Sequence, residues 1–247
     1  MNQPGLHLVR LMNEFYQQII TLKHWIVKDQ LLLEAKSILK LQALPNPNET
    51  ATAVNLFLSQ WLAEKRQYWA SQLTERQALY MDKACFSMVA LADELLILEL
   101  EWVGQESWES KLLEEHFFHS CSAGGTLYRH IDDLLAKAEH EPLEVQLAGV
   151  YLLTLRLGFS GQHRDDVKAL KHYRHKLFQL VAKHQPVFEN ILFAQAYEAQ
   201  MEFQQEQRLA PVSIWYRCAF YIAILYLISG TVAWFILLKG LDKWGAL

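Results

Sequence analysis

Two adjacent carboxylates, Asp93 and Glu94, are the side chains whose type and position most suggest chemistry. They are the only charged residues in the run from Ala84 to Leu98, which reads ACFSMVALADELLIL. Neighbouring residues on a helix point about 100° apart, so the pair is poorly placed to act together as a general acid and base. As a binding edge, one carboxylate would face outward while the other holds a neighbouring helix. The alternative is two exposed charges on an otherwise buried helix.

Two histidine pairs are the other residues with ligand-like spacing. His116 and His119 share a helix face, as do His172 and His175, so either pair could contribute to a metal site. Neither pair has an obvious third ligand, which favours ordinary surface histidines. Phosphate-binding glycine loops and the HExxH and GxSxG motifs do not occur in the sequence. We therefore predict no catalytic residue, no metal and no cofactor; a membrane-anchored enzyme that uses the acidic pair or the histidines is an alternative.

Acidic and basic residues are separated along the chain. Residues 93–115 carry eight carboxylates and one lysine, whereas residues 162–184 carry six basic residues, two aspartates and four histidines. Most such runs are solvated helix faces, but they can also form surfaces that steer partners of opposite charge. Ser87, Glu94 and Glu101 lie seven residues apart and share one polar stripe if a single helix carries them. The net charge of −4 gives no indication of a nucleic-acid partner.

The elements that must position these residues are expected to be helices. No strand alternation stands out, and helix start signals are frequent: Thr74-Glu75-Arg76-Gln77 matches a capping box, and Pro142 suits a first helical turn. We expect about seven or eight helices before the last apolar run, enough for one or two small bundles. The expected helices cover about residues 6–44 with a break near Asp29, 49–73, 74–103, 107–119, 126–138, 142–158, 165–184 and 187–207.

Prolines and glycines mark the breaks between these helices. Pro45-Asn46-Pro47-Asn48 is expected to be a breaker, because proline lacks an amide donor and constrains the residue before it. Gly158 and Gly161 bracket Phe159 at a sharp transition between two helices. Glycine permits the positive φ that such a corner needs, and Phe159 can fill the space between the helices. A structural role is therefore expected for all three residues.

A long apolar run lies near the end of the chain. Cys218 to Leu238 reads CAFYIAILYLISGTVAWFILL and contains no charged residue. At about 1.5 Å per helical residue it spans roughly 30 Å, the thickness of the hydrocarbon core of a bilayer. Trp215 and Arg217 precede it and suit a membrane interface. We expect one transmembrane helix in contact with the lipid bilayer; a buried core helix is the alternative.

Small residues recur at a spacing of four in this run, at Ala219 and Ala223 and again at Ser229 and Ala233. Such spacing lets helices approach closely, so this face is expected to contact a second copy or a partner's helix, although a lipid-facing helix fits equally well. No cleavable signal opens the chain, which favours a large N-terminal part in the cytoplasm. The expected domains are a helical segment over 1–50, a cytoplasmic helical domain over 51–211, an anchor over 212–239 and a short periplasmic tail over 240–247.

Six motifs follow one another along the chain. They are Ala90–Glu94, Trp108, Leu112–Glu114, Ala123–Tyr128, Leu155–Arg164 and Leu209–Arg217. In this order they resemble the DotU/TssL family of bacterial type IVB and type VI secretion systems, over roughly residues 55–238. The most specific parts are the terminal anchor and the Leu-Gly-Phe-x-Gly-x-x-Arg block, whose structural motif is Gly158, Phe159, Gly161 and Arg164. Gly125 departs from the family, which usually has glutamate there, so no role is assigned to such a carboxylate.

The resemblance implies an inner-membrane protein with a cytoplasmic helical domain, often two three-helix bundles in a hook, and a C-terminal anchor. It implies assembly with a large IcmF-type membrane protein, called TssM in type VI systems, and contact with other core or baseplate components. It implies no catalytic activity. Asp93 and Glu94 match the family's acidic motif on a partner-docking surface, and we extend this predicted surface to Glu101, Glu114 and Glu115.

The prediction is therefore an all-α, single-span structural subunit of a secretion apparatus, with type IVB favoured over type VI by its short tail. Its expected partners are the IcmF/TssM-type protein, other secretion components, the bilayer and a second copy of the chain. The alternative is a membrane-anchored adaptor that recruits soluble proteins outside any secretion system.

Overall fold

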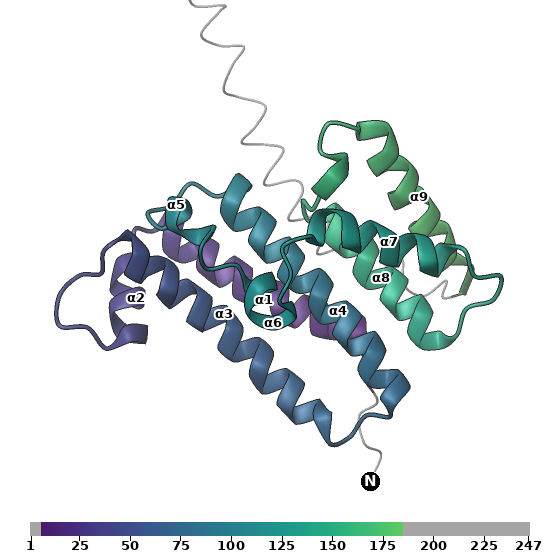
Figure 1. Ribbon diagram of the computed structural model, residues 1–247, viewed down its shortest axis with the longest axis horizontal. Helices are drawn as coiled ribbons and strands as arrows, with labels where there is room; N and C mark the ends of the chain where they lie inside the picture. Colours follow the sequence, from purple (N-terminus) through teal and green to yellow (C-terminus); the bar gives the residue numbers. More distant parts are fainter. Residues whose placement is uncertain (1–5, 185–247) are drawn as a thin grey trace, which may run out of the picture. The chain divides into compact units, whose positions relative to one another are not determined.

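The computed structural model describes residues 6–184, which form helices and no strand (Figure 1). The prediction of an all-α fold is confirmed for these residues. In chain order the helices are α1 Leu8–Val27, α2 Leu31–Leu39, α3 Pro47–Ala70, α4 Glu75–Glu94, the π-helix η1 Leu95–Glu99, α5 Gln105–Trp108, α6 Leu113–Phe118, α7 Ala123–Leu135, α8 Pro142–Arg156, the 3₁₀ turn η2 Gly161–His163 and α9 Val167–His184.

Several predictions fall outside the described residues. They are the helix expected over 187–207, the apolar run at 218–238 and the domain pieces at 212–239 and 240–247. Within residues 6–184, no helix combines the length and the apolar character that crossing a membrane requires. The arrangement of two bundles in a hook stays a prediction.

Local capping chemistry fixes where two of the long helices begin. At the start of α4, Gln77 N–H donates to Thr74 Oγ1 at 3.3 Å, and Thr74 N–H donates to Gln77 Oε1 at 3.0 Å. The predicted capping box is therefore confirmed. The predicted breaker at 45–48 is also a helix start, because Asn46 and Glu49 cap the first turn of α3 in the same reciprocal way.

Helix ends were harder to predict than helix starts. The break near Asp29 is confirmed, and Asp29 has a φ of +54° between α1 and α2. The helix expected over 107–119 is instead the pair α5 and α6, which is one reason why residues 6–184 contain nine α-helices. At the start of α9, Val167 is 59% exposed although it is apolar.

The expected continuation of one helix from Thr74 to about Val103 is wrong. The α-helix ends at Glu94, η1 continues it for one π turn, and the backbone is extended at Leu100. Side chains donate to backbone carbonyls that lack a helical partner at this end. Trp102 Nε1–H donates to Leu96 O at 2.9 Å, and Gln105 Nε2–H donates to Ile97 O at 2.7 Å. Glu101 is therefore not on the helix of Ser87 and Glu94, and the predicted polar stripe does not exist.

Helix α4 occupies the centre of the core. It packs against α1, α6, α7 and α8, and α8 also packs against α9 (Figure 1). The largest fully buried side chains include Trp108, Tyr128, Tyr151 and Phe15, and complete burial of an apolar side chain such as Phe15 stabilises the fold by about 1.5–3 kcal/mol. All described residues belong to one compact unit, Met1–Ala196. The boundary expected between residues 50 and 51 falls inside α3, and α1 shares the core of α4 and α8.

Candidate functional site

The five acidic residues predicted to form one docking surface lie in two different environments. Asp93, Glu94 and Glu114 are only 6%, 9% and 4% exposed, whereas Glu101 and Glu115 are exposed. The expectation that one carboxylate of the adjacent pair faces outward is wrong, because both are buried at the C-terminal end of α4. Their hydrogen-bond partners explain why ionisable groups are tolerated there.

Asp93 caps α6 from a different helix. Its Oδ1 accepts hydrogen bonds from Leu113 N–H at 3.0 Å and Trp108 Nε1–H at 3.1 Å, and its Oδ2 accepts one from Glu114 N–H at 2.9 Å. The residue in the capping position of α6 is Leu112, which has no side-chain acceptor. Asp93 thus satisfies amide groups that the first turn of a helix leaves unpaired.

Glu94 holds the corner between α8 and α9, defined here as residues 158–164. Its Oε1 accepts from Ser160 N–H at 3.1 Å and from the Ser160 hydroxyl at 2.6 Å, and its Oε2 accepts from Gly161 N–H at 3.0 Å. The Arg164 guanidinium pairs with the same carboxylate at 3.2 Å. The 158–164 corner is therefore fixed to the end of α4 by one buried side chain.

The glycines of the 158–164 corner have the backbone geometry that the sequence predicted. Gly158 has a φ of +125° and Gly161 a φ of +50°, and Phe159 between them is 1% exposed. A Cβ on Gly161 would lie 2.7 Å from the carbonyl oxygen of Gly124 and 2.9 Å from Cε1 of Phe159. The corner therefore approaches the first turn of α7 so closely that a side chain at Gly161 would force Gly124 or the Phe159 ring to move.

Glu114 on α6 caps the start of α7, as Asp93 on α4 caps the start of α6. Its Oε1 accepts from Ser122 N–H at 2.8 Å and from the Ser120 hydroxyl, and its Oε2 accepts from Ala123 N–H at 3.1 Å. From α7, the Tyr128 hydroxyl donates to Ser160 O at 2.9 Å. The three buried carboxylates thus link α4, α6, α7 and the 158–164 corner into one connected network.

The environment of Asp93 changes its acidity. Burial raises the pKa of Asp93 to about 7, the three N–H donors work in the opposite direction, and the nearby Glu114 carboxylate adds to the rise. Because the folded protein holds a proton on Asp93 more tightly than an unfolded chain does, the stability of this network depends on pH.

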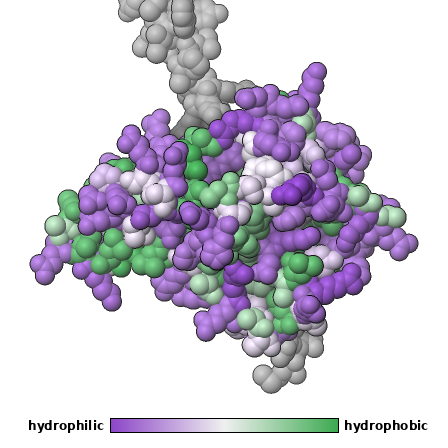
Figure 2. Space-filling model, in the orientation of Figure 1, coloured by the Kyte–Doolittle hydropathy of each residue, from purple (hydrophilic) through white to green (hydrophobic). Residues whose placement is uncertain are grey.

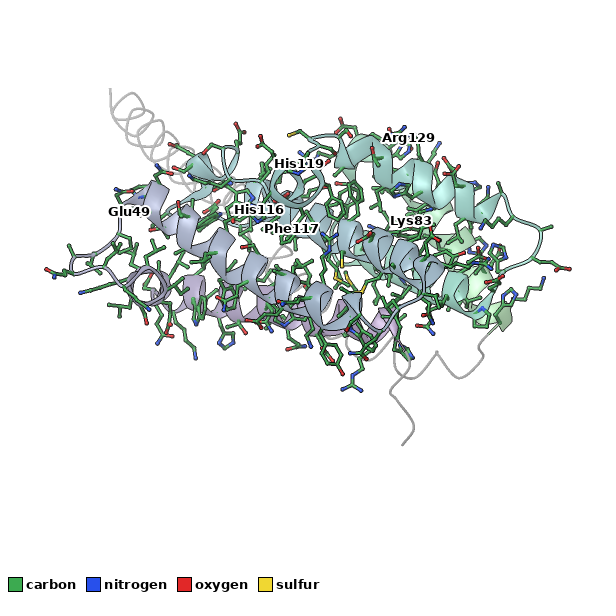
Figure 3. All side chains as sticks on the ribbon, turned by 60° about the horizontal axis from the view of Figure 1, so that its bottom comes forward. Glu49, Lys83, His116, Phe117, His119 and Arg129 are labelled. Atoms are coloured by element: carbon green, nitrogen blue, oxygen red, sulfur yellow. The ribbon has the colours of Figure 1, made fainter. Side chains whose placement is uncertain are left out.

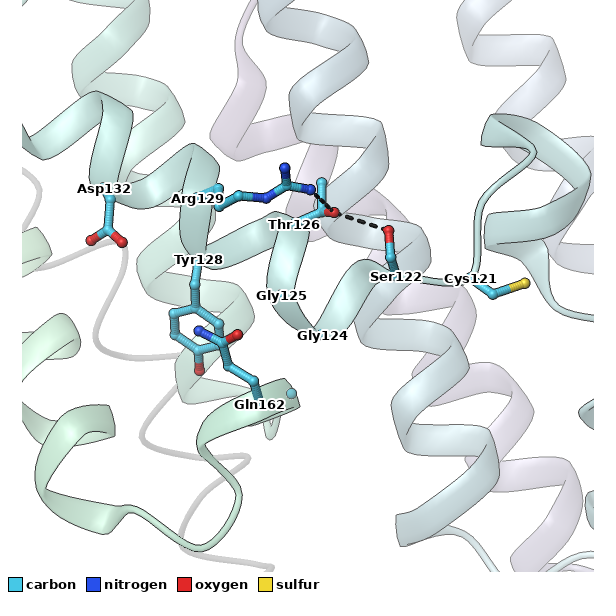
Figure 4. Close-up of a pocket in the computed structure, with 10 residues that line it drawn as sticks. Cys121, Ser122, Gly124, Gly125, Thr126, Tyr128, Arg129, Asp132 and Gln162 are labelled. Atoms are coloured by element: carbon cyan, nitrogen blue, oxygen red, sulfur yellow. Dashed lines mark hydrogen bonds between the residues drawn. The ribbon is translucent and has the colours of Figure 1, made fainter.

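A shallow pocket of about 530 Å³ opens where α7 meets the 158–164 corner (Figure 4). Gly124, Gly125 and Gln162 line it, together with Arg129, whose guanidinium donates to Thr126 Oγ1 at 2.7 Å. Gly125 is the position at which the family usually has glutamate, so this chain presents only backbone to the pocket there. The amides of Ser122 and Ala123 at the α7 start are already taken by Glu114.

The histidine pairs lie at the surface. Figure 3 shows His116 and His119 at α6, on the outside of the molecule, and both are exposed. His172 and His175 are exposed on α9. In the part of the chain that the structure describes, no group of three or more His, Cys, Asp or Glu side chains is arranged to hold a metal ion.

One buried carboxylate, Glu144 on α8, was missed by the sequence analysis. It is 2% exposed, accepts a hydrogen bond from the Tyr80 hydroxyl at 2.7 Å and pairs with Lys137. Burial raises its pKa, but the hydrogen bonds from Lys137 and Tyr80 outweigh this effect and lower the pKa to about 2. The available signal was its place in the first turn of a helix, two residues after Pro142, where a glutamate caps the helix.

The residues predicted for the membrane anchor lie outside the described part of the chain. They are Trp215, Arg217, Ala219, Ala223, Ser229 and Ala233.

Comparison with known proteins gives one match. A family profile described as "Type VI secretion system protein DotU" matches residues 32–235. Neither a curated protein nor a solved structure matches the chain. The matched range starts before the expected domain boundary at residue 51 and includes all three buried carboxylates and the 158–164 corner. The description names the type VI system, whereas the sequence favoured type IVB, and the choice between the two stays a prediction.

Proposed function

Because the chain belongs to the DotU family and so is a component of a type VI or type IV secretion system, we propose that it is a non-enzymatic structural subunit. In this proposal it assembles with an IcmF/TssM-type membrane protein and docks other components of the apparatus. The observation that carries the proposal is the family match over residues 32–235.

The buried carboxylates support a structural rather than a catalytic role. Asp93, Glu94 and Glu114 each accept at least three hydrogen bonds, all from groups of the chain itself. A general base needs a free acceptor within reach of a substrate proton. These side chains instead order the segments around them, in keeping with a protein that presents a shaped surface.

The docking surface that we propose is the exposed part of the acidic region. We define the acidic cluster as five exposed glutamates around η1, α5 and α6: Glu99, Glu101, Glu106, Glu109 and Glu115. Within residues 6–184, Glu101, Glu106, Glu109 and Glu115 form no salt bridge, so their charge is available to a basic partner, whereas Glu99 interacts electrostatically with Lys23. Asp93 and Glu114 position α6, which carries Glu115, and so act on this surface indirectly.

The membrane anchor is proposed on sequence grounds. The apolar run at 218–238 is long enough to span a bilayer, and family members are membrane-associated. We place the chain in the bacterial inner membrane by this run, with residues 6–184 on the cytoplasmic side. The small residues Ala219, Ala223, Ser229 and Ala233 then face a partner's helix or a second copy.

Extraction of the native complex in mild detergent followed by mass spectrometry tests the proposal. A large stoichiometric membrane partner encoded with other secretion components is the expected result. Recovery of the chain with soluble proteins alone would support the alternative, an adaptor outside any secretion system. Loss of secretion on deletion of the gene is expected in the first case only.

Charge reversal tests the docking surface separately. Replacing Glu101 and Glu115 by lysine should weaken co-purification of cytoplasmic components, while membrane association and thermal stability stay unchanged. The matched control replaces Asp133 and Glu139, two exposed carboxylates on and after α7, by lysine. Equal effects of both double variants would mean that net charge, rather than the acidic cluster, decides docking.

A further inference from the structure

The outer face of α9 is a stripe of basic and neutral polar side chains. Apart from its two terminal residues, the exposed positions of α9 recur at helical spacing and therefore lie on one side. We define this α9 basic face as Lys168, Lys171, His172, His175, Lys176, Gln179 and Lys183. The helix contains no aspartate or glutamate, and its other side is buried by leucine and valine. Figure 2 colours the visible surface in this region mainly as hydrophilic.

The lysines of the α9 basic face have no acidic partner in the described part of the chain. None of them takes part in a salt bridge there, whereas Lys65 and Lys137 on other helices do. Arg174, a half-buried cation of the same helix, donates from Nη2 to Leu155 O at 2.5 Å, while its Nε has no hydrogen-bond partner within residues 6–184. Asp166, just before the helix, accepts from Ala169 N–H at 2.9 Å and so caps α9. The face is thus a row of like charges without an internal counter-charge.

We propose that the α9 basic face lies on the anionic lipid headgroups of the membrane that holds residues 218–238; this inference depends on the anchor assigned under the proposed function. A basic helix face with no large exposed apolar side chain beyond Val167 suits contact with a charged surface without insertion. Each lysine near an anionic bilayer strengthens binding about five-fold, so four strengthen it on the order of several hundred-fold.

The tether makes such a contact effective even if it is weak. Residues 185–217 connect α9 to the apolar run, and a chain of this length spans at most roughly 120 Å. Anchoring therefore keeps the α9 basic face at a high effective concentration near the headgroups. Salt should weaken the contact, because exposed charges are screened over about 10 Å at 0.1 M ionic strength.

The contact would also orient the described unit. Helix α5, within the acidic cluster, and helix α9 lie on opposite sides of the view in Figure 1. An anionic surface attracts the α9 basic face and repels the acidic cluster. The membrane therefore turns the acidic cluster away from itself, where a basic cytoplasmic partner can reach it.

The test measures the distance of α9 from lipid headgroups in the full chain. Gln179→Cys places a fluorophore on the α9 basic face, in a background in which Cys121 and Cys218 are replaced by alanine. The chain is reconstituted into nanodiscs of phosphatidylcholine alone or mixed with phosphatidylglycerol, each with a headgroup-labelled acceptor lipid. Energy transfer should be higher with phosphatidylglycerol and should fall at high salt.

Two variants that each remove four lysines identify the source of the effect. Glutamine at all four lysines of the face should weaken the phosphatidylglycerol-dependent contact on the order of 100-fold or more. The matched control removes the same charge elsewhere, by glutamine at Lys28, Lys36, Lys40 and Lys83, and should behave like the parent chain.

Three results would overturn the proposal. The first is equal energy transfer in the two lipid compositions, or equal transfer in both lysine variants. The second is transfer that depends on the number of copies in each disc rather than on phosphatidylglycerol, which would assign the face to an acidic protein surface. The third is failure of the chain to enter discs of either composition. This failure would overturn the proposed anchor as well, and it would occur whether or not the α9 lysines are present.

Discussion

The contact between Gly161 and Gly124 allows a sharp test of how the 158–164 corner is held. Gly161→Ala adds a methyl group at a φ of +50°, where an L-residue is disfavoured by about 1 kcal/mol. That carbon would lie 2.7 Å from Gly124 O, 3.0 Å from Gly124 Cα and 2.9 Å from Phe159 Cε1. Two of these atoms are backbone and the third belongs to a buried ring, so the clash should add about 1–3 kcal/mol.

Gly161→Ala is therefore expected to lower the free energy of unfolding by about 2–4 kcal/mol. For a chain of this size, such a loss lowers Tm by roughly 5–15 °C. The assay is thermal and urea unfolding of the full chain in mild detergent, followed by far-ultraviolet circular dichroism. Hydrogen exchange at the Gly161 amide, which donates to Glu94, should speed up in the same variant.

The matched control is an alanine substitution at Gly124, the residue that Gly161 contacts. A Cβ on Gly124 would be 3.5 Å from its nearest neighbour, Gln162 N, which is an ordinary distance. Gly124→Ala should therefore be neutral or stabilise α7 by up to about 1 kcal/mol. A Gly161→Ala protein as stable as the parent chain, or a Gly124→Ala protein equally destabilised, would refute this description of the corner.

Three further predictions concern the buried carboxylates. Because the pKa of Asp93 is raised to about 7, its contribution to stability is complete below the ordinary pKa near 4 and is lost as pH rises through 7. Urea unfolding should show a loss of about 2–3 kcal/mol from about pH 5 to pH 8, and Asp93→Asn should flatten that part of the profile. Glu144 should behave in the opposite way: its pKa is lowered to about 2, so its contribution is present above the ordinary pKa and is lost as pH falls through 2. Glu144→Gln should thus cost roughly 1–3 kcal/mol near neutral pH, and less in acid, by the same assay. Glu94→Gln should cost about 2–4 kcal/mol and lower Tm, whereas Glu115→Gln on the exposed side should change stability by less than about 0.5 kcal/mol.

The outcome for Asp93 and Glu94 changes how mutations there must be interpreted. Charge reversal of this pair would disturb more than a docking surface, because both side chains hold the fold together through buried hydrogen bonds. Lost secretion in such a variant would report lost structure as readily as lost binding. Exposed members of the acidic cluster, such as Glu101, separate the two effects.

The sequence by itself determined the all-α class, the family and several local features, namely helix caps, helix breaks and turns. The capping box at Thr74 and Gln77, the break at Asp29 and the positive φ of Gly158 and Gly161 follow from interactions within a few residues. Such features are encoded locally, because a cap or a turn needs only its own side chain and the next few amides.

Only the tertiary structure decided which acidic residues are buried and where α4 ends. The amides that pair with Asp93 lie 20 and 21 residues further along the chain, and those that pair with Glu94 lie 66 and 67 residues away. A run of charges looks the same in sequence whether its carboxylates face water or donors from distant segments. Burial depends on which segments the fold brings to the end of α4, and packing between α4, α6, α7 and α8 sets that arrangement rather than any local pattern.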